Sequence, residues 1–325
     1  MKTISKVFIA SGTVVSVAAV AAISHKITKT LMQVALDRNI PNKLTTNQHA
    51  KKQLLGSEDN VLLRNMIEAY AESLRNQPHQ IVETIGHNGE RLVGHWFTCK
   101  GASRTVIAMH GWRSSWAEDF GMIHDFIRAN RCNVLYAEQR AHGNSGGEYL
   151  GFGLLERYDC RKWIDWVNLA VGDSLPIYLC GISMGATTVL MTADLDLPDN
   201  VCGMIADCGF TSPYAIWMYV AKNNLRLSTG IRGKIANDIC KQKLQMSGTS
   251  HSATKSMNAC KIPVLFIHGT DDRFVPIRMT YENYKACAAP KRLLVVPGAD
   301  HGMSYYIDKE QYEAAVCRFW NEFDE

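Results

Sequence analysis

Short apolar runs and longer stretches of mixed polarity alternate along most of this 325-residue chain. Runs of about four to eight apolar residues are typical of strands buried on both faces, whereas an apolar residue at every third or fourth position is typical of amphipathic helices. The expected strands are 81–85, 91–97, 105–109, 132–136, 176–180, 201–206, 263–267 and 293–296, and the main expected helices are 61–75, 116–129, 154–170, 277–288 and 309–323. The alternation predicts an α/β fold, with a mostly parallel central sheet flanked by helices.

The chain before this alternation has a different pattern. Residues 31–78 are mostly helical in pattern and are expected to form a lead-in without visible chemistry. The first two expected strands flank Gly86-His87-Asn88-Gly89, a turn signal typical of an antiparallel hairpin. We therefore expect residues 79–325 to form the main domain, with one hairpin at its start.

An uncharged run covers residues 7–24, between lysines on its N-terminal side and His25, Lys26 and Lys29 on the other. It just reaches the length that spans a bilayer as a helix, although many of its residues are small or hydroxylated. We expect residues 1–30 to be an uncleaved membrane anchor, which would make the protein membrane-associated. A cleaved signal and a secreted protein are one alternative, with Ala19-Val20-Ala21 as the cleavage site, and a buried or peripheral helix is the other. Positive charge on both sides leaves the orientation open.

Composition argues against several classes of function. The net charge of +4 is small and the globular part contains no basic block, so nucleic-acid binding has no support. The ten cysteines include no C-x-x-C pair, which argues against a zinc site. Several cysteines stand in apolar runs, so we expect most to be buried, reduced thiols.

The pentapeptide Gly181-Ile182-Ser183-Met184-Gly185 carries the strongest chemical signal. An apolar run typical of a strand precedes it, and small apolar residues suited to a buried helix follow it. A strand, a sharp turn and a helix are the setting in which G-x-S-x-G forms a nucleophile elbow. The turn strains the backbone at the serine and leaves no room for side chains at Gly181 and Gly185. We therefore expect Ser183 to be a nucleophile at a helix N-terminus, where developing negative charge is favoured.

Further motifs occur at the ends of the expected strands. They are His110-Gly111-Trp112, Arg140-Ala141-His142-Gly143-Asn144-Ser145, His268-Gly269-Thr270-Asp271-Asp272-Arg273-Phe274-Val275-Pro276 and Gly298-Ala299-Asp300-His301. With them, the chain from about residue 80 onward resembles the α/β-hydrolase superfamily. It is most similar to bacterial serine hydrolases with a hydrophobic N-terminal segment and to ABHD-type esterases. Ala141 replaces the usual glycine of R-G-H-G and Glu138 a commoner aspartate, and neither departure removes a catalytic group.

The resemblance implies a catalytic triad. Ser183 would be the nucleophile, His301 the base that takes its proton, and Asp272 the acid that orients the imidazole. The chain order serine, aspartate, histidine is the one that this fold uses. Asp207 and Asp271 are the open alternatives for the acid. For the base, His110, His142 and His268 are less well placed than His301.

The resemblance also implies an oxyanion hole, made by the backbone N–H groups of Trp112 and Met184. The segment of about 211–258 is expected to form a small helical cap, whose aromatic and methionine residues suit an apolar acyl or aryl group. The sequence thus predicts a serine hydrolase that cleaves a carboxylic ester, thioester or amide of a small-molecule acyl substrate, without a metal or cofactor. A short-peptide serine peptidase is the alternative, and a non-catalytic binding module on the same fold is a third interpretation.

Overall fold

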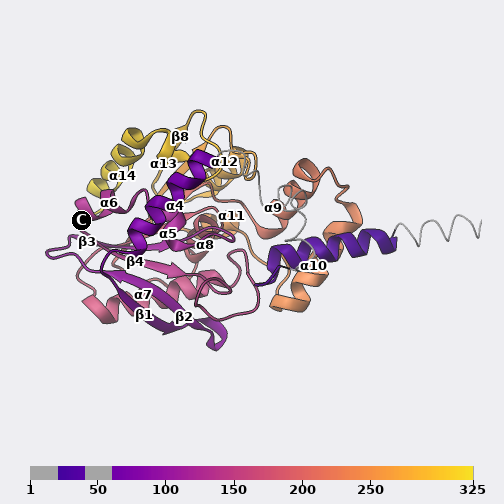
Figure 1. Cartoon of the computed structure of the whole chain (residues 1–325), viewed down its shortest axis with the longest axis horizontal. Coiled ribbons are helices and arrows are strands. Elements are labelled where there is room, and N and C mark those ends of the chain that lie inside the picture. Colours follow the sequence, from indigo (N-terminus) through magenta and orange to yellow (C-terminus); the bar gives the residue numbers. More distant parts are fainter. Residues whose placement is uncertain (1–20, 41–60, 325) are drawn as a thin grey trace, which may run out of the picture.

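The structure is a computed structural model that describes residues 21–40 and 61–324, and an eight-stranded sheet forms its centre (Figure 1). The strands are β1 (Gln80–Ile85), β2 (Arg91–Phe97), β3 (Arg104–Met109), β4 (Cys132–Glu138), β5 (Ile177–Ile182), β6 (Val201–Asp207), β7 (Val264–Gly269) and β8 (Lys291–Val296). Their order in the sheet is β1-β2-β4-β3-β5-β6-β7-β8. The pairs β1–β2 and β2–β4 are antiparallel and all other neighbours are parallel. The predicted α/β fold with a mostly parallel sheet is confirmed.

Helices cover both faces of this sheet. One face carries α7 (Glu156–Val171), α8 (Met184–Thr192), α11 (Ala253–Ala259) and α12 (Ile277–Ala286). The other carries α4 (Val61–Arg75), α5 (Trp116–Phe120), α6 (His124–Ala129), α13 (Ser304–Ile307) and α14 (Lys309–Phe323). A short 3₁₀ turn, η1 (His87–Gly89), closes the opening hairpin.

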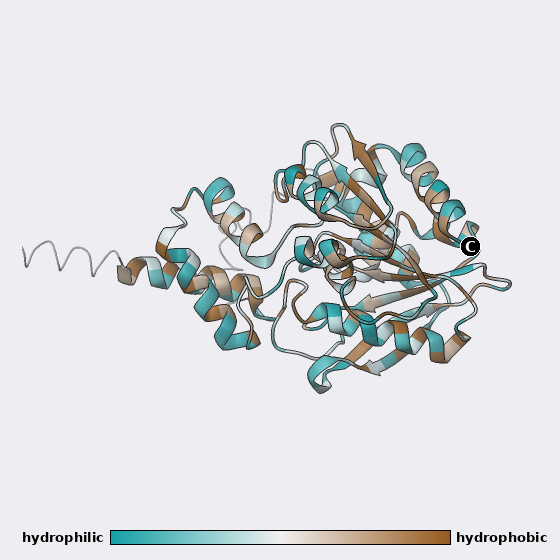
Figure 2. Cartoon of the chain, turned by 180° about the vertical axis from the view of Figure 1, so that it is seen from behind, coloured by the Kyte–Doolittle hydropathy of each residue, from teal (hydrophilic) through white to brown (hydrophobic). Residues whose placement is uncertain are grey.

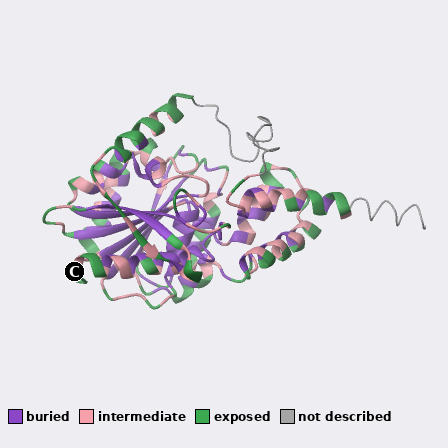
Figure 3. Cartoon of the chain, turned by 60° about the horizontal axis from the view of Figure 1, so that its bottom comes forward, coloured by how far each residue is buried: buried purple, intermediate pink, exposed green. Residues whose placement is uncertain are grey.

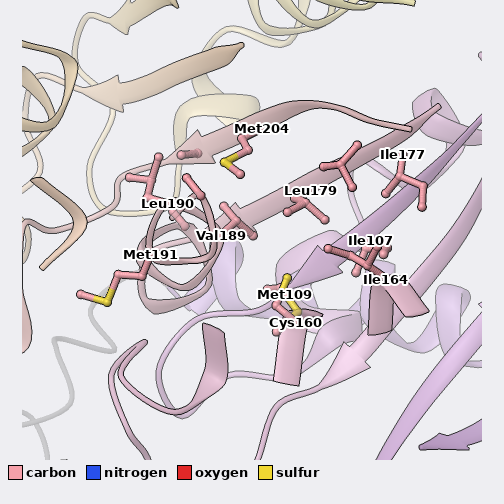
Figure 4. Packing of buried hydrophobic residues seen from close by; sticks show 14 of the residues in the cluster. Ile107, Met109, Cys160, Ile164, Ile177, Leu179, Val189, Leu190, Met191 and Met204 are labelled. Carbon is pink, nitrogen blue, oxygen red and sulfur yellow. The ribbon is translucent and has the colours of Figure 1, made fainter. Parts of the chain in front are cut away.

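The sheet is buried because apolar residues point to both of its faces. All six residues of β3 are buried, and Figure 3 shows the central strands as buried along most of their length. On one side Leu179 of β5 packs with Ile164 of α7 and Val189 of α8 (Figure 4). Strands enclosed on both faces need such continuous apolar runs, and these runs are why the central strands could be predicted from the sequence.

The helix expected over residues 116–129 is in fact two helices, α5 and α6. The backbone of α4 passes so close to Gly121 that a Cβ there would lie 2.8 Å from the carbonyl carbon of Tyr70. The crossing therefore requires glycine, and glycine weakens a helix interior. The chain turns after Gly121 and the second helix begins at His124.

A helical cap lies between β6 and β7 in the sequence. It consists of α9 (Pro213–Tyr219), the π-helical turn η2 (Val220–Asn224) and α10 (Gly230–Leu244). A further helix, formed by residues 21–36, lies beside the cap, in indigo in Figure 1, and Figure 2 shows hydrophobic residues on both. Met32 and Leu36 of this helix are buried in one cluster with Trp217 of the cap. The expected boundary between anchor and lead-in, at residue 30, therefore falls inside a helix that packs on the folded domain.

Over residues 21–40 and 61–324, no helix combines the length and apolar character needed to cross a bilayer. Most of the run 7–24, on which the expected anchor rests, lies outside these residues.

All ten cysteines are free, seven of them buried and three half-buried. The buried thiols pack as small hydrophobic side chains.

Candidate active site

The serine motif forms a strand–turn–helix elbow in the middle of the sheet. Ser183 stands between β5 and α8 with φ 55° and ψ −114°, a strained conformation for a residue with a side chain. A Cβ at Gly185 would overlap the backbone oxygen of Met109, and a Cβ at Gly181 would overlap the backbone of Gly185. Close backbone contacts therefore require both glycines, as the motif predicts.

Ser183 begins a chain of hydrogen bonds that includes the predicted base and acid. Nε2 of His301 lies 2.8 Å from Oγ of Ser183, and Nδ1 of His301 lies 2.7 Å from Oδ2 of Asp272. A carboxylate only accepts hydrogen bonds, so Nδ1 of the neutral imidazole carries the proton and Nε2 can accept from the serine hydroxyl. The Asp272 side chain is fully buried, whereas 24% of the His301 side chain is exposed. The imidazole is thus anchored on one side and open on the other.

The loop after β7 holds Asp272 as an anion. The backbone N–H groups of Phe274 and Val275 donate to Oδ1 at 2.9 and 2.8 Å, and Nε2 of His268 lies 3.1 Å from Oδ2. Burial opposes ionisation of Asp272, but the charge of His301 and the hydrogen bonds from both histidines outweigh it and hold its pKa well below the usual range.

The same contacts act in the opposite direction on the base. Burial alone would lower the pKa of His301, but the neighbouring Cys208 sulfur and the Asp272 carboxylate raise this pKa well above its usual value. Burial raises the pKa of the Cys208 thiol to about 11, so this thiol is neutral near neutral pH. Asp272 is therefore the charged partner that stabilises an imidazolium at His301.

The two alternative acids lie elsewhere. Asp207 is buried and accepts a hydrogen bond from Oγ of Ser304 at 3.0 Å, while its backbone oxygen accepts from the N–H of Ser183. Burial raises the pKa of Asp207 to about 6. Asp271 is exposed and accepts from Oγ1 of Thr270. Within the described residues neither carboxylate has a hydrogen bond to His301, so the geometry favours Asp272.

The three other motif histidines have structural partners on both ring nitrogens. His110 bonds to the oxygen of Gly111 and accepts from the N–H of Gln139. His142 bonds to the oxygen of Arg140 and accepts from the N–H of Arg113, and His268 bonds to Thr280 and to the oxygen of Val275. Burial lowers the pKa of His142 to about 3, so its imidazole is neutral. These histidines hold the loops around Ser183 in place.

Two backbone N–H groups stand where an oxyanion hole is expected. Met184 is the first residue of α8, and Trp112 belongs to the turn after β3, which passes so close that a Cβ on Gly111 would lie 3.4 Å from Cβ of Ser183. In the described part of the chain, the backbone N–H groups of Trp112 and Met184 donate no hydrogen bond to a loop, a turn or another element. Both donors are thus available to a ligand.

Asp119, in α5, is a supporting residue that sequence reasoning missed. Its carboxylate accepts from the N–H of Gly111 at 2.6 Å and from Oγ of Ser114 at 2.5 Å, so it fixes the turn that carries Trp112. An acidic residue in the first turn of a helix is common for dipole reasons alone, and therefore carried no distinct signal.

A pocket of about 300 Å³ opens in front of the serine. Its walls come from the turn after β3, from α4 and α5, and from the histidine loop; Ile67, Trp112, Glu118, Ser183 and His301 are among the residues that line it. This volume suits a small molecule or one end of a larger one.

One group of potential metal ligands lies at the same place. Suitable atoms of Cys208, Asp272 and His301 lie within 4.8 Å of one another. However, a metal needs the thiolate form of cysteine, and burial disfavours that form here. The imidazole and the carboxylate are also already hydrogen-bonded to each other. The donor set therefore fits proton transfer better than metal binding.

Comparison with known proteins identifies relatives in sequence. No family model matches the chain. The protein YqkD of Bacillus subtilis (strain 168), described only as uncharacterized, is 27% identical over 237 residues, which cover 73% of this chain and 77% of YqkD. The uncharacterized protein YfhR of Salmonella typhimurium is 24% identical over 202 residues, which cover 62% of this chain and 65% of YfhR.

Solved structures show the fold. The esterase Pf2001 of Pyrococcus furiosus superposes with a TM-score of 0.63 at 24% identity, covering 76% of this chain and 92% of the esterase. The α/β hydrolase GrgF of a Penicillium species gives 0.59 at 15% identity, covering 76% and 99%. A puromycin-hydrolyzing peptidase of Mycobacterium tuberculosis gives 0.60 at 14% identity, covering 76% of this chain but 39% of the peptidase. The protein has the α/β-hydrolase fold.

Proposed function

We propose that this protein is a serine hydrolase that cleaves a carboxylic ester through an acyl-enzyme, with Ser183, His301 and Asp272 as its triad. The observation that carries the proposal is the continuous hydrogen-bonded chain from Oγ of Ser183 through His301 to Asp272, at 2.8 and 2.7 Å. A serine hydroxyl becomes a nucleophile only when a base takes its proton, and this geometry supplies the base and its orienting acid.

The proposed reaction has two halves. Oγ of Ser183 forms a bond to the ester carbonyl carbon as its proton moves to Nε2 of His301, and the N–H groups of Trp112 and Met184 stabilise the oxyanion. The bond to the alcohol oxygen then breaks and His301 returns the proton to that oxygen. In the second half, a water molecule attacks the acyl carbon as one of its protons moves to Nε2 of His301. The bond between the acyl carbon and Oγ of Ser183 then breaks, His301 gives the proton to Oγ, and the carboxylic acid leaves.

An ester is favoured over a peptide as the substrate. Two proteins with similar folds, Pf2001 and RhEst1 of a Rhodococcus species, are named esterases, and the match covers 92% and 99% of their chains. A short-peptide peptidase remains the second candidate, because the peptidase from Mycobacterium tuberculosis shares the fold over part of its length. Thioesters and amides use the same groups, so a panel of acyl esters beside short peptide amides distinguishes these substrates.

The proposal includes membrane association through the N-terminal segment. The support is the uncharged run 7–24, whose length matches a bilayer. Secretion after signal cleavage is the alternative.

The test of the function is Ser183→Ala. We expect hydrolysis of an activated ester to fall by about three orders of magnitude or more, and labelling by a fluorophosphonate to disappear, because no other side chain takes over the attack. An unchanged melting temperature is the control for folding. Labelling that survives the substitution would place the nucleophile elsewhere.

A further inference from the structure

A second pocket, largely apolar, lies between the cap and the helix of residues 21–36. Its volume is about 90 Å³, and fourteen of its sixteen lining residues are apolar. Leu31 and Met32 come from helix 21–36, Ile216 and Ala221 from the cap, and Phe152 from a loop of the main domain. Helix 21–36 thus forms a wall of this pocket, although it precedes the predicted hydrolase domain in the sequence.

The apolar pocket adjoins the pocket of the serine, and Trp112 lines both. The Trp112 indole N–H donates to the backbone oxygen of Ala35 at 2.9 Å, so helix 21–36 holds this ring in place. Phe274 stacks on Trp112, with ring centroids 6.2 Å apart and planes 16° apart, and its ring lies 5.1 Å from that of His301. Two aromatic rings therefore stand between His301 and the apolar pocket.

We propose that the apolar pocket receives the acyl chain of the ester and that helix 21–36 determines the accepted acyl length. The inference rests on the proposed function. When the ester carbonyl oxygen points to the N–H groups of Trp112 and Met184, the acyl chain must extend along a neighbouring surface. The rings of Trp112 and Phe274 provide such a surface, and both also line the apolar pocket. The substrate class is thus an ester of an aliphatic carboxylic acid with a longer chain than acetic acid.

The size of the pocket sets the expected chain length. A free volume of about 90 Å³ holds only a few methylene groups without rearrangement. Met32 and Met218 line the pocket, and methionine side chains are flexible enough to move aside for a longer chain. We expect kcat/KM to rise roughly fourfold per added methylene from acetyl to about hexanoyl esters, the gain associated with burying one methylene group.

The first test reduces the pocket. Ala221→Leu places a larger side chain in the wall, and we expect it to lower kcat/KM for the hexanoyl ester at least about tenfold while acetyl ester hydrolysis changes by less than about twofold. Ala215→Leu is the matched control, because Ala215 belongs to the same cap but does not line this pocket. Its profile should remain that of the wild type.

The second test addresses helix 21–36. Leu31→Asn makes the wall polar and should flatten the acyl-length profile, whereas Lys29→Asn, at an exposed position of the same helix, should not. A wild-type profile that is flat, or variants that affect acetyl and hexanoyl esters equally, would overturn the inference while Ser183-dependent acetyl hydrolysis persists. Absence of any Ser183-dependent hydrolysis would instead refute the proposed function.

Discussion

Asp272 and Asp207 are buried carboxyl groups near the same histidine, yet their surroundings shift their pKa values in opposite directions. Asp272 accepts hydrogen bonds from backbone N–H groups and histidines, which hold its pKa low. Asp207 accepts one hydrogen bond from a hydroxyl, and burial raises its pKa to about 6. Environment, rather than distance from the serine in the sequence, therefore separates the proposed acid of the triad from a structural carboxyl.

Asp272→Asn should lower kcat about 10³- to 10⁴-fold, because an amide does not hold the His301 imidazole in the required tautomer. The pH profile gives a second readout. Activity needs neutral His301, so kcat/KM rises with pH through the His301 pKa, which Asp272 raises. Removing the charge should move this rise to lower pH. Asp271→Asn is the control, and a larger loss from Asp207→Asn would show that the acid was misassigned.

Asp207→Asn should stabilise the protein at high pH. A carboxyl whose pKa is raised on folding contributes full stability only below its unfolded pKa, and loses it as pH rises to about 6. The loss is at most about 3 kcal/mol at pH 7, and an asparagine can still accept from Ser304. Melting temperatures should therefore differ little near pH 4 and favour the variant near pH 8. A variant that is less stable at both pH values would contradict the assigned pKa.

The strand–turn–helix elbow at Ser183 shows how a local element depends on its neighbours in the sheet. Gly185, in the first turn of α8, lies against the end of β3, and the backbone oxygen of Met109 occupies the place of a Cβ. Gly230 stands at the start of α10. A Cβ added there would have no neighbouring atom within 4 Å, and the φ of Gly230 is not left-handed. The two glycines thus have different reasons for being glycine.

Gly185→Ala should destabilise the protein by about 3 kcal/mol or more and abolish ester hydrolysis, since β3 and α8 would have to separate. The matched substitution Gly230→Ala should be neutral or stabilising by about 0.5 kcal/mol, because alanine restricts the unfolded chain. Urea unfolding and ester hydrolysis measure both effects. Equal stabilities for the two variants would mean that α8 adjusts freely.

The sequence predicts the strands more completely than it predicts where the helices end. All eight strands were predicted, most of them from apolar runs and the first two from the hairpin turn signal at residues 86–89, and the motifs placed Ser183, Asp272 and His301 at strand ends. The division at Gly121 was not predicted, since it depends on the approach of α4, a contact between segments about fifty residues apart. The role of Asp119 was missed for a similar reason: only the folded chain brings its carboxylate to the N–H of Gly111.

At the scale of the whole molecule, the surroundings of the N-terminal region could not be predicted from its sequence. An apolar helix has the same sequence pattern whether a bilayer or another part of the protein covers it. Over residues 24–36 the cover is protein: Ser24, Thr28, Met32, Val34 and Leu36 are buried. Arg113 donates to the backbone oxygens of Val34 and Asp37, which ties the end of this helix to the turn beside the serine. The helix is part of the domain that carries the site.

The final prediction follows from this arrangement. If residues 7–24 form an anchor, the mature chain begins at or near Met1 and sediments with membranes. Removing residues 1–20 should release a soluble and active protein. Removing residues 1–36 should not, because burial of Met32, Val34 and Leu36 contributes on the order of 5 kcal/mol and Trp112 would lose its contact with Ala35. Mass spectrometry of the N-terminus, sedimentation and acyl-length profiles of the truncated chains measure these outcomes. A mature start near Ala22 would favour secretion, and full activity without residues 1–36 would refute the role of this helix.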